Sequence, residues 1–179
     1  ALEAPPALTL TTGGDAAWSG LLRGDAADGT DCATGGTVAS GSTSWLEAAT
    51  AGPAHFDFRC RVTGTSADRL DISLGGMNAW SLMPLVENPW QSVRAWLPAG
   101  GHSLRWTWHP DGTLAFTDEA ALDSLSPVTG LSVPEALDAA ARPWLTGGRG
   151  LSWSAAASGA GDGSACAVCS IDRAGADAW

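Results

Sequence analysis

An internal repeat is the feature that most constrains the fold of this 179-residue chain. Two Trp residues, a Cys-Ala pair and several Gly-containing turns recur in the same order, which chance rarely gives for residues this uncommon. The offset is 135 residues between Trp18 and Trp153 and 134 between Cys32 and Cys166, so the copies align with gaps of a single residue. The landmarks are 1–4, 12–14, Trp18, 28–30, 32–33 and Trp45 in the first copy, and 136–139, 146–148, Trp153, 162–164, 166–167 and Trp179 in the second.

The repeat also predicts how the chain is divided. We expect a complete module over residues 1–129, a linker with a short helix over 130–142, and an incomplete second module over 143–179. Within the first module, apolar and polar residues alternate in 55–62, 69–74, 91–97 and 104–109, with Gly- and Pro-containing turns between them. Because alternation with period 2 is typical of strands with one buried face, we predict an all-β fold, an antiparallel jelly-roll-like sandwich.

Charge and composition exclude several classes of protein. The chain has nine Arg, no Lys and 19 acidic residues, for a formal net charge of −10. Such a chain lacks the basic surface that neutralises a phosphate backbone, so we expect no nucleic-acid partner. The absence of Lys excludes Schiff-base chemistry, a P-loop and Lys–Asn isopeptide bonds. With no apolar run of about 18 residues, we expect no membrane insertion by a helix.

Three segments of the first module resemble a known type of domain. They are residues 44–46 (Ser-Trp-Leu), 51–58 (a Gly-Pro turn leading into a Phe-containing strand) and 97–108 (Pro-Ala-Gly-Gly-His followed by alternating Leu and Trp). Together they resemble the tandem β-sandwich repeat module of bacterial surface proteins, a jelly roll of the MAM or concanavalin-like kind. The resemblance covers about residues 5–128 and begins again near 135. It implies a secreted, modular protein with an adhesive or structural role at the bacterial cell surface.

The four cysteines are expected to form disulfides in such a setting. The resembled module usually has an aromatic residue where Cys60 stands, and this departure implies an added bond between Cys60 and Cys32; two buried thiols are the alternative. Cys166 and Cys169 form a Cys-x-x-Cys that the repeat places in a strand. This position disfavours a redox pair, and too few further ligands are available for zinc. We therefore expect these two to bond across a turn or to another molecule.

Candidate ligand sites are few. Asp28 and Asp31 near the start of the module, with Asp118 and Asp123 near its end, are weak candidates for Ca²⁺; acidic solvated loops are the alternative. No other cofactor is expected. Among the ten Trp residues, Trp80, Trp90 and Trp96 are the candidates for an exposed platform that stacks on sugars. None of the three His residues falls in a catalytic motif, so we expect no enzyme.

The incomplete second module is the strongest functional feature of the sequence. A fragment of a sandwich exposes apolar residues and open strand edges, which must be covered by a partner. The expected assembly surface comprises Trp144, Leu145, Trp153, Val168, Ile171 and Trp179. Our first hypothesis is an extracellular, non-enzymatic structural or adhesive protein. It would assemble with itself head to tail by strand complementation, as a filament or surface array. The alternative is a carbohydrate-binding module that recognises a surface glycan.

Overall fold

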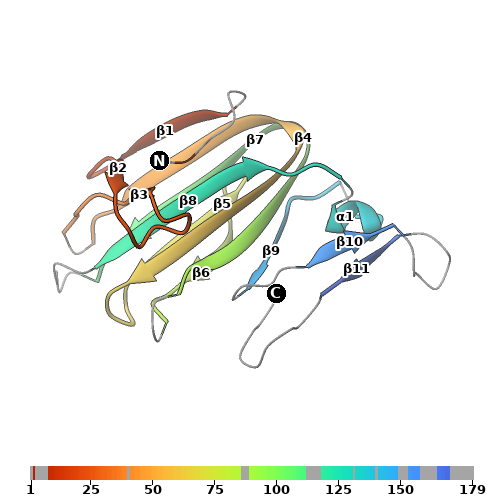
Figure 1. Cartoon of the computed structure of the whole chain (residues 1–179). Helices are drawn as coiled ribbons and strands as arrows, with labels where there is room; N and C mark the ends of the chain where they lie inside the picture. Colours follow the sequence, from red (N-terminus) through yellow and green to blue (C-terminus); the bar gives the residue numbers. More distant parts are fainter. Residues whose placement is uncertain are drawn as a thin grey trace.

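The computed structural model describes residues 2, 8–39, 41–85, 89–111, 118–130, 132–139, 141–148, 153–157 and 165–169. These residues form one nine-stranded antiparallel sheet, one two-stranded antiparallel sheet and one short helix (Figure 1). The all-β prediction is therefore confirmed. The elements are β1 (Thr9–Gly14), β2 (Ser19–Leu22), β3 (Asp31–Thr34), β4 (Ser44–Thr63), β5 (Arg69–Leu74), β6 (Met77–Leu82), β7 (Gln91–His109), β8 (Glu119–Pro127), α1 (Val133–Ala136), β9 (Trp144–Gly148), β10 (Ser154–Ala156) and β11 (Cys166–Val168).

Two long strands, β4 and β7, run side by side through the large sheet and have different neighbours at their two ends. Residues 44–52 of β4 and 100–109 of β7 lie with β1, β5 and β6, and we call this part half A. Residues 54–63 of β4 and 91–97 of β7 lie with β2, β3, β8 and β9, and we call this part half B. Figure 1 shows β4 and β7 turning over at one end of the sheet, between the two halves.

The bend between the halves requires glycine. The pairing of β4 with β7 changes register between Gly52 and Ala54, next to a cis peptide bond between Gly52 and Pro53. A Cβ atom at position 52 would lie 1.8 Å from the carbonyl oxygen of Pro98. Since no side chain fits in that space, glycine allows the two strands to turn together at this point.

The inner faces of the two halves form one core. The rings of Phe58 in half B and Trp106 in half A meet edge to face, with centroids 5.1 Å apart and planes at 89°. The apolar side chains of the alternating pattern are buried in every segment: Phe56, Phe58, Cys60, Val62, Leu70, Ile72, Leu74, Val93, Ala95, Leu97, Leu104, Trp106 and Trp108. Period-2 alternation therefore identified the core face of each of these strands.

The short helix α1 lies within the residues predicted as the linker. Ser132 caps it: its hydroxyl accepts a hydrogen bond from the Glu135 amide at 3.3 Å, and its own amide donates to the Glu135 carboxylate at 2.8 Å. Pro134 lies in the first turn, and the helix ends at Ala136. Asp138, with φ at 55°, carries the chain out of the helical conformation.

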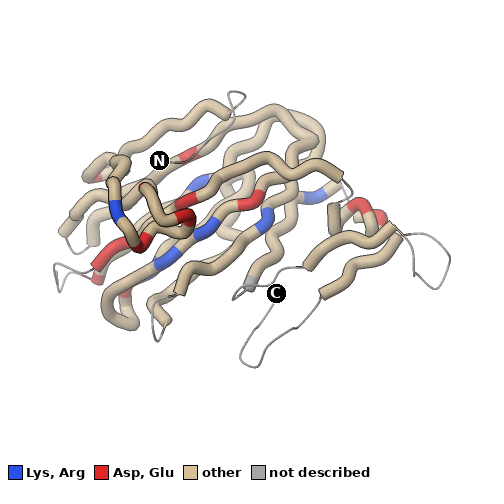
Figure 2. The backbone as a smooth tube through the Cα atoms, in the orientation of Figure 1, with Lys and Arg blue, Asp and Glu red and all other residues tan. Residues whose placement is uncertain are grey.

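Charged residues are interspersed along the strands of the large sheet (Figure 2). In half B, the Asp57 carboxylate pairs with the Arg94 guanidinium at 2.5 and 2.6 Å. In half A, the Glu47 carboxylate accepts from the Arg105 guanidinium at 2.8 Å. Each of these two pairs joins directly opposed residues of β4 and β7, so they bridge the two central strands on the outer face of the sheet.

Candidate assembly surface

The predicted boundary between the modules does not coincide with the edge of the large sheet. Strand β9 pairs with the first part of β7 in half B: Trp144 opposes Trp96, Leu145 opposes Ala95 and Thr146 opposes Arg94. β7 has β4 on one side along almost its whole length. On its other side it pairs with β5, followed by β6, in half A and with β9 in half B. Residues 144–148, expected in the second module, thus complete the sheet of the first.

Two residues of the expected assembly surface are engaged in this contact. Leu145 packs against the main core, and the Trp144 indole nitrogen donates a hydrogen bond to the carbonyl of Ala139 at 3.2 Å. Both were predicted to need cover from another molecule. In the structure both are half-buried and make these contacts within the chain, because β7 presents a sheet edge that β9 extends.

The hairpin β10–β11 repeats the hairpin β2–β3 residue for residue. In the first copy Ser19 opposes Thr34, Gly20 opposes Ala33 and Leu21 opposes Cys32. The second copy has the same register, as Ser154 opposes Val168, Ala155 opposes Ala167 and Ala156 opposes Cys166. Since these pairs match under the offsets found in the sequence, the repeat is present in the tertiary structure as well.

The two hairpins differ in what covers them. Strand β3 pairs on its other side with β8, whereas within the described residues β11 pairs only with β10. Trp18 is buried in the main core, but its counterpart Trp153 is half-buried. Thr34 is buried, but its counterpart Val168 is 39 % exposed. Ile171 and Trp179, the other expected members of the surface, lie outside the described residues.

The strand that opens each copy also differs in its contacts. The Thr12 hydroxyl of β1 donates to the carbonyl of Trp45 at 2.9 Å and accepts from the amide of Trp18 at 2.7 Å. Its counterpart in β9, Thr146, is buried, and its hydroxyl has no hydrogen-bond partner among the described residues. The threonine is therefore satisfied beside β4 and unsatisfied beside β7.

The predicted Cys32–Cys60 disulfide is wrong, and none of the four cysteines is in a disulfide in the structure. Cys60 opposes Leu122 of β8, which in turn opposes Ala33 of β3, so Cys60 and Ala33 lie in one row. Cys32 precedes Ala33 and faces the opposite side of the sheet, about 9.6 Å away at two strand spacings. That separation exceeds the reach of a disulfide. Cys60 belongs to the main core and Cys32 to a small cluster on the other face.

The three candidate platform Trp residues do not come together. Trp80 is half-buried on β6 in half A, packed against the main core. Trp90 lies under the Arg61 guanidinium, 4.7 Å from its ring centroid, and donates its indole N–H to the carbonyl of Asp25 at 3.0 Å. Trp96 is 8 % exposed and contacts the ring of His55. These side chains pack within the protein and do not form one exposed platform.

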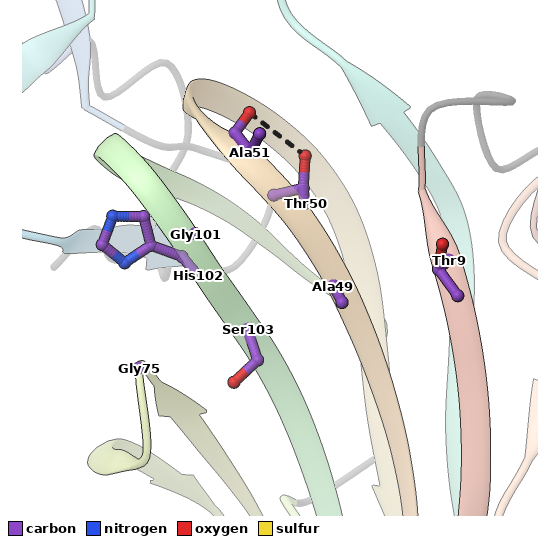
Figure 3. A pocket seen from close by; sticks show the side chains of 8 residues that line it. All are labelled: Thr9, Ala49, Thr50, Ala51, Gly75, Gly101, His102 and Ser103. Carbon is purple, nitrogen blue, oxygen red and sulfur yellow. Dashed lines mark hydrogen bonds between the residues drawn. The ribbon is translucent and has the colours of Figure 1, made fainter.

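A shallow groove of about 660 Å³ lies on half A beside the bend (Figure 3). It is lined by Thr9 of β1, by residues 49–51 of β4, by Gly75 and by residues 101–103 of β7. The lining includes alanine and glycine residues, three side-chain hydroxyl groups (Thr9, Thr50 and Ser103) and the His102 imidazole. Sequence analysis missed this groove, because three strands distant in sequence combine to form it.

The weak Ca²⁺ candidates are also divided. The Asp28 carboxylate accepts from the Thr30 amide at 2.9 Å, and Asp123 accepts from the amides of Ala27 and Ser124 at 2.7 and 2.6 Å. The bonds from the Ala27 and Thr30 amides stabilise the turn that precedes β3, and Asp31 is the first residue of that strand.

Asp118 instead lies with Asp68 and Asp111. Their carboxylate oxygens come within 4.8 Å of one another. Asp68 accepts from the amides of Thr65 and Asp111 at 2.6 and 2.7 Å. Three carboxylates suit a hard cation, but the hydrogen bonds also give the buried Asp68 a structural role.

Comparison with known protein families and with curated proteins finds no match for this chain. Within the described residues, no helix has the length and apolar character that crossing a membrane requires.

Proposed function

We propose that this protein is a non-enzymatic structural or adhesive module that associates with copies of itself at the bacterial cell surface. One observation carries the proposal: the second copy of the repeat extends the sheet of the first through β9, while among the described residues no strand pairs with β11 in the place that β8 takes beside β3. In such a chain the edge of β7 accepts a strand, and the edge of β11 is available for pairing among the described residues.

The fold we infer is a β-sandwich of the jelly-roll kind. The contact between Phe58 and Trp106 supports it, because these residues belong to different halves of the sheet and share one core. Sandwich modules in tandem are suited to load-bearing and adhesive roles. Fold alone gives no activity, so the extracellular setting follows from the resemblance of the sequence and remains part of the proposal.

Association by strand edges follows from the exposed features of β11. A strand edge presents unpaired amides and carbonyls, and a second chain can satisfy them by adding a strand. When the donor and acceptor surfaces differ, each copy binds the next in the same sense, and the contact yields a filament. Cys166 and Cys169 lie on this hairpin or next to it, so an oxidising environment can add a covalent link between copies.

The test is the size of the assembled protein, measured by light scattering and negative-stain microscopy with and without reductant. We expect large species in the native protein and their loss in Val168→Lys, which places a charge on β11. Met77→Lys is the matched control, because Met77 is a more exposed apolar residue that lies on β6 and outside the hairpin β10–β11. A native protein that stays monomeric at every concentration contradicts the proposal.

Carbohydrate binding is the second candidate, and the groove beside the bend is the observation that favours it. Its hydroxyl groups and imidazole are hydrogen-bonding partners for sugar hydroxyls, although no Trp lines it. Filling the groove with Ser103→Phe should abolish binding on a glycan array, whereas Trp96→Ala should leave it unchanged. A blank array for the native protein removes this candidate.

A further inference from the structure

The inference starts from the different positions of β9 and β1 in the large sheet. By sequence β9 is the counterpart of β1. Yet β1 pairs with β4 at the edge of half A, and β9 pairs with β7 at the edge of half B. The equivalent strands of the two copies therefore lie at two different edges of the same sheet.

The position beside β7 is well matched to β9. Five consecutive residues pair in register, from Trp144 opposite Trp96 to Gly148 opposite Ser92. Leu145 adds an apolar side chain to the main core, and the neighbouring Gly147 is buried. These contacts involve only β9 and the module that receives it, so a β9 from any copy of the chain would make them equally well.

The same position leaves one group of β9 unsatisfied. The Thr146 hydroxyl is buried without a partner among the described residues, whereas Thr12 makes two hydrogen bonds beside β4. An unsatisfied buried hydroxyl makes the free energy of pairing between β7 and β9 less favourable. This strand is therefore easier to release than β1.

The connection that leads to β9 allows it to reach another molecule. Sixteen residues, 128–143, join the end of β8 to the start of β9, and four of them form α1. Helix α1 contacts both β10 and β11, and Figure 1 shows these three elements to one side of the large sheet. Residues 128–130, between the end of β8 and α1, are in neither a helix nor a strand, so the exchange would place its hinge there.

We propose that the edge of β7 is a strand-exchange site that receives β9 from a second copy of this chain. Each copy would donate β9 and accept the β9 of the next, which links copies head to tail. The proposal rests on the proposed function, because it names the contact by which copies associate.

The experiment separates exchange from other modes of association. In a Cys166→Ser, Cys169→Ser background, one protein carries Arg94→Cys and another carries Thr146→Cys, at two positions that oppose each other in β7 and β9. An equimolar mixture can form the 94–146 disulfide only between two chains. A single chain carrying both substitutions reports whether β9 lies on its own β7 and whether the variants fold.

We expect an intrachain 94–146 disulfide in the double variant. We also expect a disulfide-linked dimer in the mixture that increases with protein concentration, identified by mass spectrometry of the joined peptides. The control mixture combines Thr50→Cys with His102→Cys, which oppose each other in β4 and β7 within the fixed part of the sheet. That mixture should give no dimer.

Two results would overturn the exchange. One is a mixture that cross-links no more than the control while the double variant closes within its chain. The other is a folded double variant that forms no 94–146 bond. If light scattering still shows large assemblies, the proposed function stands on another contact. If the mixture cross-links but the native protein forms only closed dimers, the strand exchange is supported and the proposal of a filament is rejected.

Discussion

At the scale of the residue, matched positions in the two copies show how environment changes what one side chain does. Thr12 and Thr146 occupy equivalent places in the repeat, but only Thr12 has hydrogen-bond partners among the described residues. Cys32 and Cys60 are both buried, yet they face opposite sides of one sheet. In each case the neighbouring strands decide the role of the residue.

The threonine pair gives a direct test. Thr12→Val removes the acceptor of the Trp18 amide, so we expect the free energy of unfolding to fall by about 1 kcal/mol. Thr146→Val removes a hydroxyl that has no partner, and we expect the free energy of unfolding to stay the same or to rise. Urea denaturation followed by Trp fluorescence measures both. An equal loss in the two variants would show that Thr146 is hydrogen-bonded in solution.

His55 predicts how stability depends on pH. Burial, reinforced by the nearby Arg94 guanidinium, lowers the pKa of His55 below its ordinary value. The His55 imidazole is then protonated near pH 6.5 in the unfolded chain but only at a lower pH in the folded chain. Because the unfolded chain binds more protons in this range, the free energy of unfolding should decrease as pH falls from about 7.5 to 5.5. His109 contributes in the same direction, because its burial also lowers its pKa.

Denaturation at the two pH values measures this effect. His55→Gln should reduce the loss of stability on acidification, and His102→Gln, at the groove, is the control. A pH dependence that is unchanged in His55→Gln would show that this imidazole is not the source.

At the scale of the element, the bend in β4 and β7 decides the architecture. Each strand continues from half A into half B, so the same two strands contribute buried residues to the core from both halves. The bend depends on the close approach of Gly52 to Pro98. Alternation along the sequence continues on both sides of this point and gives no sign of how sharply the strands turn.

Gly52→Ala tests the bend. The added methyl overlaps the Pro98 carbonyl oxygen, so the free energy of unfolding should fall by about 1–3 kcal/mol or more. Gly101→Ala is the matched control, since a Cβ at that position meets nothing within 4 Å, and its effect should stay within about 0.5 kcal/mol. Thermal unfolding of the two variants measures the difference, and similar melting temperatures would contradict the structure at the bend.

At the scale of the whole molecule, one strand of the second copy of the repeat, β9, lies in the large sheet of the first, while β10 and β11 form a sheet of their own. Leu145 belongs by sequence to the second copy and packs by structure in the core of the first. The first module therefore depends on a strand from the second for its complete fold.

Leu145→Ala should lower the stability of the entire large sheet, by about 1–3 kcal/mol for a half-buried leucine. Leu137→Ala is the control, because Leu137 is 47 % exposed and lies before β9. Unfolding followed by far-ultraviolet circular dichroism should show one shifted transition for Leu145→Ala. A transition identical to that of the native protein would mean that β9 contributes nothing to the first module.

The sequence by itself determined the all-β class, the buried face of the main strands and the repeat. Alternation of side chains is a local property of extended backbone, so Phe56, Phe58, Trp106 and Trp108 could be assigned to the core from pattern alone. The pairing of residues across neighbouring strands, the bend and the position of β9 were decided only by the tertiary structure. A strand pairs with whichever edge is available and fits it, and that choice depends on residues far away in the chain. For this reason Cys32 and Cys60 lie on opposite faces, the three candidate Trp residues lie apart, and β9 completes the module that precedes it.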